Sequence, residues 1–471
     1  MDIADEATKA REIVFLRLHP LVGQGTSIEG FYHGPLWLYF ISIGFLIFNF
    51  HPFGSLFMLF LLNVATTAIL MRQIAKKVSP KVAIVIGASI QFFWPYYDTT
   101  RFAFSPFPLV SIAIFDILLL SETLQGNAIA FILAAIVSSL PSHFEIASLP
   151  PFIALFLTVG IWSLFKKKIT TKNFLIAILA LVLTNIARLI SEILTGFAQL
   201  HAIQKHIAAE NSFTSNTQFQ EFAEKLITII QEGLIPQNAL VSIIVAITIL
   251  ALLFRLKKAN AFIKNFYLLT LILTLFTLFW FSSNTGWHPW HTIYIPPLFF
   301  IATLLVISRF RKNYAIPLYF AFMLFQVPVF VKNYAYNFRP TDDASLLVNE
   351  LAAVDWTYQE SQGKGFYVYS YLPSVYDYPY QYLYWWRGTQ KYKYVPCEYT
   401  TVPGIPDFFI KNYQRYQQPQ RPCANIRYLI IEPDKNTSNQ NLWLSQVRKN
   451  TSLEKEVKFG TIRIEKRRIG P

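Results

Sequence analysis

Long apolar runs separated by short polar segments occupy most of the chain between residues 35 and 332. They fall at about 35–50, 54–71, 80–97, 106–120, 127–140, 150–165, 173–194, 237–254, 265–283, 289–309 and 314–332. Hydrophobic residues make up 54% of the sequence and the mean hydropathy is +0.37, which is too apolar for a soluble domain. A full membrane span needs roughly 20 apolar residues. The fold class that we expect is therefore an all-α polytopic membrane protein with a helical bundle.

Clusters of lysine and arginine punctuate these runs and predict the topology. They lie at Arg72/Lys76/Lys77, Lys166/Lys167/Lys168/Lys172, Arg255/Lys257/Lys258/Lys264 and Arg309/Arg311/Lys312. The positive-inside rule places all of them on the cytoplasmic side. An even number of runs separates each cluster from the next, so every run except 35–50 is expected to cross completely. The formal charge of +14 does not indicate nucleic-acid binding, because the basic residues form no continuous face.

The run 35–50 is expected to lie along the outer surface or to re-enter the membrane. It is short, contains Gly44 and ends at the break His51-Pro52-Phe53-Gly54. Residues 2–33 and the other polar connections then face outward, on the extracytoplasmic side of the plasma membrane. Because the chain opens on a polar segment, we expect a further span upstream of it. The long polar stretch 195–236 contains a helical pattern around 219–227, and loops of this length are usually lids or disordered segments.

After residue 337 the composition changes to alternating polar and aromatic residues. Strands are predicted at 365–371, 427–431 and 461–465, and a helix at 345–357. The domain organisation that we expect is a transmembrane domain over 1–337 and a small extracytoplasmic α/β domain over 338–471. Cys397 and Cys423 are the only cysteines, which excludes a cysteine-based metal cluster. In an oxidising compartment they are expected to form a disulfide.

Acids and a histidine precede the first apolar run. Asp2, Asp5 and Glu6 lie near the start and His33 directly before the run. A carboxylate there could act as a general base toward an acceptor hydroxyl or amine. The alternative is a solvated segment beside the membrane, since the D-x-x-D-E pattern is weak by itself.

Further ionisable residues sit at the outer ends of the apolar runs. Asp98 and Arg101 form either a plain ion pair or part of a site. His143, with Glu145 close by, is either a structural hydrogen-bonding residue or a ligand-binding one. His291 lies three residues after His288, but two histidines do not make a metal site.

Arg188 is the most informative of these residues. With Asn185 and Glu192 it occupies one helix face, at spacings of three and four residues. Arg188 either pairs with Glu192 or binds an anionic group such as a phosphate, which a planar guanidinium suits. Charged residues within membrane segments rarely face lipid, so we include both in the candidate site. No Walker loop, G-x-G-x-x-G, G-x-S-x-G or H-E-x-x-H motif is present.

Several of these motifs together resemble the GT-C superfamily of membrane glycosyltransferases. They are Asp5-Glu6-Ala7, Tyr32-His33-Gly34-Pro35-Leu36, Tyr97-Asp98 with Arg101, Pro141-Ser142-His143, and Trp290-His291-Thr292-Ile293-Tyr294 before Pro296-Pro297. The nearest branch is the protein mannosyltransferase-like group, which includes the bacterial aminoarabinose lipid A transferases. The resemblance covers residues 2–330. It departs from the pattern in two places, because the first span is missing and His33-Gly34-Pro35 replaces a His-Pro-Pro sequence.

The resemblance implies a polyprenyl-phosphate-linked sugar as the donor, used on the extracytoplasmic face. The base of the family then falls on Asp2, or on the pair Asp5-Glu6, with Asp2 the first choice. The residues expected to bind substrate are His33, Asp98, Arg101, His143, Arg188, Glu192 and His291. Apart from Glu192, they and the three acids are expected to converge on one outward-facing cavity, because an isolated charge at the outer membrane boundary is poorly solvated.

The function that we expect is therefore transfer of a sugar from a polyprenyl phosphate to an acceptor lipid, glycan or protein. Arg188 or Arg101 would stabilise the departing phosphate. The partners are the donor, the acceptor and the bilayer, with no nucleic acid. No cofactor is assigned, and a divalent cation is left open. The rival interpretations are a transporter or flippase, which would need paired broken helices, and a non-catalytic protein that binds a sugar lipid.

Overall fold

The computed structural model describes residues 2–210, 218–255, 260–283, 288–338, 341–373, 376–404 and 421–470. The chain divides into two units. The first comprises residues 1–17, 45–52 and 338–471, and the second residues 18–44 and 53–337. Each unit is described by itself below. The predicted fold class, a polytopic helical protein with a small C-terminal α/β domain, is confirmed.

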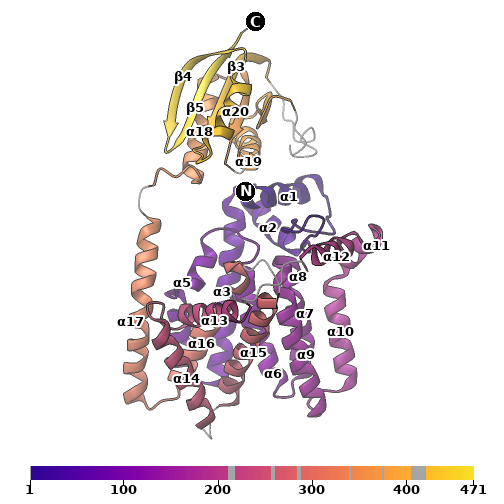
Figure 1. Ribbon diagram of the computed structural model, residues 1–471, viewed down its shortest axis with the longest axis vertical. Coiled ribbons are helices and arrows are strands. Elements are labelled where there is room, and N and C mark those ends of the chain that lie inside the picture. Colours follow the sequence, from indigo (N-terminus) through magenta and orange to yellow (C-terminus); the bar gives the residue numbers. More distant parts are fainter. Residues whose placement is uncertain are drawn as a thin grey trace. The chain divides into compact units, whose positions relative to one another are not determined.

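Helices make up nearly all of the described secondary structure before residue 338 (Figure 1). In chain order they are α1 (Asp2–Leu16), α2 (Leu36–Ile47), α3 (Phe53–Lys77), α4 (Pro80–Gln91), α5 (Trp94–Tyr97), η1 (Asp98–Thr100), α6 (Pro108–Thr123), α7 (Ala128–Ser139), α8 (Pro141–Phe144), η2 (Ile146–Ser148), α9 (Leu149–Phe165), α10 (Thr171–Thr184), α11 (Ile186–Leu194), α12 (Ala198–Glu210), α13 (Gln218–Gly233), α14 (Ala239–Arg255), α15 (Ala261–Ser283), η3 (Pro289–Thr292), α16 (Ile295–Ile307) and α17 (Lys312–Asn337).

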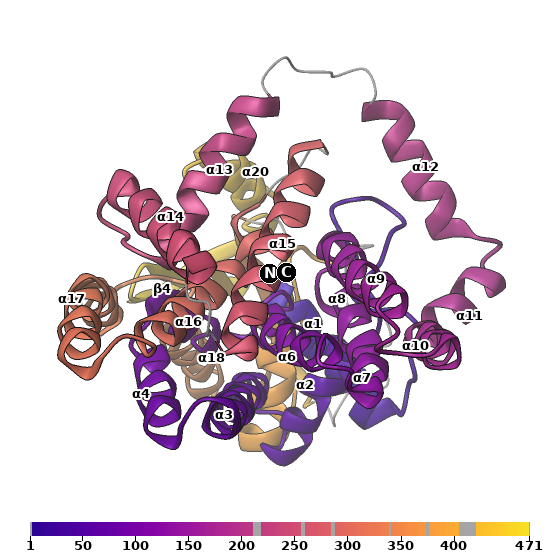
Figure 2. The ribbon, with the colours of Figure 1, turned by 90° about the horizontal axis from the view of Figure 1, so that it is seen from below.

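Within the second unit, α6 lies at the centre of the bundle. It contacts α3, α7, α9, α15 and α16, and Figure 2 shows these helices end-on. Nearly every residue of α6 and α16 is buried, including Ile114, Ile117 and Phe300. Helices that are apolar all round are stable only where protein or lipid covers every face. The helix predicted around 219–227 is α13, which packs against α15 and α16.

The expectation that every apolar run except 35–50 makes a complete span is wrong. Among the described residues, five helices are long and apolar enough to cross a membrane, or six if the bent pair α10–α11 is one span. The run 80–97 is interrupted between α4 and α5, where Pro95 lacks an amide proton and its ring opposes the carbonyl four residues earlier. The run 173–194 bends by 59° between α10 and α11. The helices α4, α7 and α14 contain only shorter apolar stretches.

The turns that carry the first two basic clusters meet at one end of the second unit, where Asn260 before α15 also lies. Lys77 forms an ion pair with Glu122 at 2.5 Å. Lys168 donates to the carbonyl oxygen of Leu124, and Asn260 donates to that of Lys77. Two helices that begin at this end have side-chain N-caps: Ser79 caps α4 and Thr170 caps α10. The first two basic turns therefore share one end of the helices, as predicted.

The C-terminal part is a mixed sheet with helices. The strands are β1 (Gly365–Tyr371), β2 (Glu398–Thr400), β3 (Cys423–Ile431), β4 (Thr451–Phe459) and β5 (Ile462–Ile469), in the order β2-β1-β3-β5-β4. β1 pairs in parallel with β2 and β3, and β5 pairs antiparallel with β3 and β4. The helices are α18 (Leu347–Glu360), α19 (Tyr378–Arg387), η4 (Gly388–Tyr392) and α20 (Thr437–Val447). The strands and the helix predicted here are confirmed, whereas β2, β4, α19 and α20 were not predicted.

The N-terminal helix belongs to the same unit as this sheet. The guanidinium of Arg11 lies 4.6 Å from the ring centroid of Trp385, and Phe15 packs edge-on against that ring. From the segment 45–52, the carbonyl of Phe50 accepts a hydrogen bond from Tyr382 at 2.7 Å. Burial of these large rings drives the association. The unit is thus assembled from three separate stretches of sequence.

Cys397 and Cys423 form a disulfide, as expected, with their Cα atoms 6.1 Å apart. The bond joins the residue before β2 to the first residue of β3. The two cysteines are 26 residues apart in sequence, and the segment between them contains β2. A crosslink of this length limits the conformational freedom of the unfolded chain.

Removing the disulfide is expected to lower the free energy of unfolding of the first unit by roughly 3 kcal/mol. The measurement is a urea titration of the full chain in detergent, with and without dithiothreitol, followed by tryptophan fluorescence. The double variant Cys397→Ser/Cys423→Ser is the control, and its midpoint should match that of the reduced wild type. Identical midpoints for oxidised and reduced wild type would contradict the prediction.

Candidate active site

A loop before α2 lies directly on α8 within the second unit. The amide of Gly34 donates to the carbonyl of Ser142 at 2.8 Å. A Cβ atom at Gly34 would lie only 2.0 Å from Nδ1 of His143, so a larger residue would push the loop away. The neighbouring His33 is 8% exposed, and its Nδ1 accepts a hydrogen bond from the amide of Ile146 at 3.2 Å. The structure thus brings together two histidines that are far apart in sequence.

The same short helix contacts the bend between α10 and α11. Nε2 of His143 lies 3.0 Å from the carbonyl oxygen of Thr184, so this nitrogen carries the proton. Nδ1 is then the acceptor, and it is buried without a hydrogen-bond partner among the described residues. Oγ of Ser142 lies 2.6 Å from Oδ1 of Asn185. These contacts hold the bend against α8 and fix where α11 begins.

Arg188 projects from the first turn of α11. Its guanidinium carbon lies 5.7 Å from the ring centroid of Phe31, two residues before His33. Within the described parts of the chain, Nε of Arg188 is buried without a hydrogen bond, and no carboxylate oxygen lies within 4.0 Å of Arg188. Glu192 therefore interacts with Arg188 only through its charge, without the close contact of an ion pair. Glu192 instead accepts a hydrogen bond from the amide of Leu200 at 3.2 Å.

Glu145 and His291 form the second half of the cluster. Oε1 of Glu145 lies 3.9 Å from Nε2 of His291. Nδ1 of His291 accepts from the amide of His288 at 3.2 Å, so its proton is on Nε2 and faces Glu145. The two side chains are 8% and 5% exposed. Burial raises the pKa of Glu145 to about 7.

The turn η2 connects the two halves of the site. The amide of its first residue, Ile146, donates to Nδ1 of His33, and the amide of its second residue, Ala147, donates to Glu145 at 3.3 Å. Trp280 donates to the carbonyl of Ala147 at 2.9 Å. We call the set His33, His143, Glu145, Arg188 and His291 the η2 cluster. It combines a cation with an unused donor, buried imidazoles and a carboxyl group with a pKa near neutrality. Such a set suits the binding of an anionic substrate and proton transfer.

Asp98 and Arg101 are predicted site residues that the structure pairs with each other. Nε of Arg101 donates to Oδ1 of Asp98 at 2.7 Å, and the guanidinium stacks over Trp94 at 5.0 Å. Burial raises the pKa of Asp98, and Arg101 opposes the shift. No contact among the described residues joins this pair to the η2 cluster. The simpler interpretation, an ion pair, accounts for its geometry.

A mostly apolar cavity of about 350 Å³ lies beside this pair. Phe60, Val64, Ala68 and Met71 line it from one face of α3, and Thr100, the neighbour of Arg101, lines it from η1. Asn63, Thr67 and Gln91 add polar atoms.

The three acids predicted as catalytic all lie on α1, in the first unit. The side chain of Asp2 lies outside the described residues. Asp5 forms an ion pair with Lys9 at 2.7 Å and its side chain is 27% exposed, whereas Glu6 is only 1% exposed. The remaining predicted site residues belong to the second unit. No group of three or more His, Cys, Asp or Glu residues in the described ranges could hold a metal ion.

Sequence reasoning noted Glu145 beside His143 but left it out of the expected site. An acid between apolar residues at the start of a run was the signal that could have identified it. Gln199 was not considered, although its Oε1 accepts from the amide of Tyr32 at 3.1 Å and so helps to position the loop before α2. That contact spans 167 residues of sequence and has no local signature.

The helical bundle and the C-terminal sheet of this chain together match the fold of the GT-C membrane glycosyltransferases. It is similar to ArnT from Cupriavidus metallidurans bound to undecaprenyl phosphate, with a TM-score of 0.57 and 10% sequence identity over 99% of this chain and 93% of that one. The apo state of that protein gives a TM-score of 0.56, also at 10% identity, over 98% and 93% of the two chains.

The resemblance to the GT-C superfamily drawn from the sequence is thereby confirmed as a likeness of fold. No protein-family model matches the chain. No curated protein matches it either.

Proposed function

We propose that this chain transfers a sugar from a polyprenyl-phosphate donor to a nucleophilic group of an acceptor. The observation that carries the proposal is Arg188, a half-buried arginine near His143 whose Nε is buried without a hydrogen bond to the described residues. A guanidinium in this state binds phosphate oxygens well, because its planar fork matches their geometry. The solved protein with the same fold holds a polyprenyl phosphate.

The reaction breaks the bond between the anomeric carbon and the phosphate oxygen, and forms a bond from that carbon to the acceptor. The phosphate leaves with the bonding electrons, and Arg188 stabilises its charge. The acceptor proton passes to a carboxylate. The resemblance assigns this base to α1, and Asp5 is the first residue to test because its described side chain forms an ion pair with Lys9 and is partly exposed. Asp2 and Glu6 remain candidates, and His33, His143, Glu192 and His291 would shape the donor site.

The test is an assay of the purified full chain in nanodiscs with labelled undecaprenyl-phosphate-linked sugars. A transferase releases undecaprenyl phosphate at a rate that depends on added acceptor. Movement of the labelled donor between leaflets without release would instead identify a flippase. Binding with neither release nor movement would identify a non-catalytic binding protein. Either of these results would overturn the proposal.

We place this chemistry on the extracytoplasmic side of the plasma membrane. Two basic turns share one end of the helices, and the positive-inside rule assigns that end to the cytoplasm. Cysteines introduced at Thr26 and Asn436 are expected to react with an impermeant maleimide from outside the cell, in a Cys-free background. A cysteine at Lys167 should react only after the membrane is opened. Labelling at Lys167 from outside would reverse the orientation.

Turnover is expected to fall as the pH drops through about 7, because Glu145 becomes protonated there. Below that pH its neutral form no longer attracts the Nε2 proton of His291, which then loses its orientation. The rate should fall about tenfold per pH unit on the acid side and level off on the basic side. Glu145→Gln should be slower and should lack this limb of the pH profile. A limb at the same pH in that variant would assign it to another group.

A further inference from the structure

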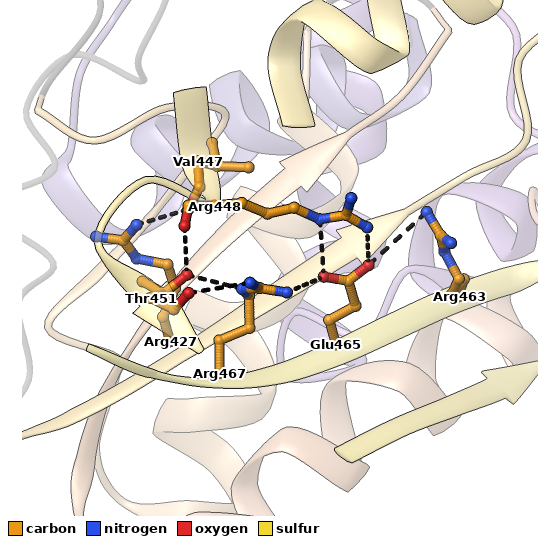
Figure 3. Close-up of polar contacts among 7 residues, drawn as sticks. All are labelled: Arg427, Val447, Arg448, Thr451, Arg463, Glu465 and Arg467. Atoms are coloured by element: carbon orange, nitrogen blue, oxygen red, sulfur yellow. Dashed lines mark hydrogen bonds and ion pairs between the residues drawn. The ribbon is translucent and has the colours of Figure 1, made fainter. Parts of the chain in front are cut away.

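Four arginines lie close together on one face of the C-terminal sheet, near the C-terminal end of α20 (Figure 3). Arg427 on β3 pairs in register with Arg467 on β5, and Arg463 lies four residues before Arg467 on the same strand. Alternate residues of a strand share a face, so all three point to one side. Arg448, the residue after α20, reaches the same place from the helix end. We call these four residues the arginine cluster.

A single buried carboxylate sits at the centre of the cluster. Glu465 is 1% exposed. Its Oε1 accepts from Arg448, and its Oε2 accepts from Nε of Arg448 at 3.1 Å and from Nη1 of Arg467 at 2.7 Å. Arg467 also donates to Thr451 at 2.7 Å, which fixes its guanidinium in place. The carboxylate of Glu465 thus fixes the positions of Arg448 and Arg467. Its two oxygen atoms already accept three hydrogen bonds, which leaves little room for a further donor.

The other two arginines have unused donors. The guanidinium of Arg463 approaches Oε1 of Glu465 only to 3.8 Å, and the side chain of Arg463 makes no hydrogen bond within the described part of the chain. Arg427 donates to the carbonyl of Val447 at 2.6 Å and stacks over Tyr369, but its Nε is buried with no partner in the same described part. A guanidinium has five N–H donors, so the cluster holds many that protein atoms do not satisfy.

The charges on this face do not balance. On β4, Lys458 lies opposite Arg463, and Glu456 lies opposite Glu465. Together with the arginine cluster, five cations therefore face two carboxylates. The side chains of Arg448 and Arg463 are 38% and 31% exposed, so a ligand can reach them. Confined like charges repel one another, and a bound anion with several oxygen atoms would relieve that repulsion.

We propose that the arginine cluster binds a phosphate group, with Arg463 and Arg448 as the exposed ligands and Glu465 as the residue that holds Arg448 in position. The planar forks suit the paired oxygens of a phosphate or pyrophosphate. Two sources present this chemistry, a free phosphate compound and the headgroup of an anionic lipid. The site lies within the first unit and does not depend on the transferase activity proposed above.

The experiment measures binding to the full chain in uncharged detergent by isothermal titration. One arm uses inorganic pyrophosphate, and the other uses micelles doped with short-chain phosphatidylglycerol. The test variant is Arg463→Gln, because the side chain of Arg463 makes no hydrogen bond within the described part of the chain and its loss should leave the fold intact. The matched control is Arg468→Gln. Arg468 is the next exposed arginine of β5, points to the opposite face, and pairs with Glu454 at 2.7 Å.

Wild type and Arg468→Gln are expected to bind with equal affinity, and Arg463→Gln at least about tenfold more weakly. Binding should weaken as sodium chloride is added. Binding in the pyrophosphate arm identifies a free phosphate site, and binding only in the lipid arm identifies a headgroup site. If Arg463→Gln melts at a lower temperature than wild type, Arg448→Lys provides the second test. No binding in either arm, or equal losses in Arg463→Gln and Arg468→Gln, would overturn the proposal.

Discussion

Replacing Arg188 with alanine is expected to lower kcat/KM for a polyprenyl-phosphate-linked sugar by about 10²- to 10³-fold. The guanidinium is held over Phe31 by the start of α11, and its Nε has no hydrogen-bond partner among the described residues. A donor aimed at the departing phosphate would stabilise the transition state more than the bound donor lipid. Steady-state release of undecaprenyl phosphate, measured over a range of donor concentrations, separates the change in kcat from that in KM.

Two further substitutions make this test specific. Arg188→Lys keeps the charge but loses the planar fork, so it should recover only part of the lost rate. Arg309→Ala removes an exposed arginine just after α16 and should leave the donor kinetics unchanged. If Arg188→Ala retains wild-type kcat/KM in a folded protein, Arg188 does not bind the phosphate. Arg101 would then be the next cation to test.

Neutralising Asp5 with the variant Asp5→Asn is expected to reduce kcat by about 10²- to 10⁴-fold, the usual contribution of a general base. The change preserves the size of the side chain and removes its capacity to accept a proton. Its ion pair with Lys9 is partly exposed and of the kind that contributes little to stability, so the protein should remain folded. The measurement is single-turnover transfer at saturating donor and acceptor, with Asp2→Asn and Glu6→Gln assayed beside it.

Glu12→Gln is the matched control, because Glu12 lies two helical turns farther along α1. It should retain the wild-type rate. If Asp2, Asp5 and Glu6 can all be neutralised with transfer intact, the base does not lie on α1. Glu145 then becomes the leading carboxylate, since its pKa of about 7 suits proton transfer near neutral pH, and Asp98 follows.

Local pattern was enough to predict most elements of the fold. The apolar runs correspond to helices, and the strand predicted at 365–371 matches β1 in both limits. These signals are local, because hydrophobic periodicity and strand propensity need only neighbouring residues. The interruptions of the runs were missed. Pro95 marks one of them in the sequence, but the bend after Thr184 depends on Ser142 and His143, which approach it from another helix.

The sequence by itself determined which residue types could form a site: acids and a histidine before the first apolar run, and an arginine, histidines and glutamates at the ends of later ones. It also supplied Cys397 and Cys423 as a disulfide pair. Only the tertiary structure decided the partners. Gly34 lets a loop lie on His143, η2 joins His33 to Glu145, and Arg188 is left with an unused donor. Such contacts depend on how helices pack over long sequence separations, and packing leaves no periodic signal in the chain.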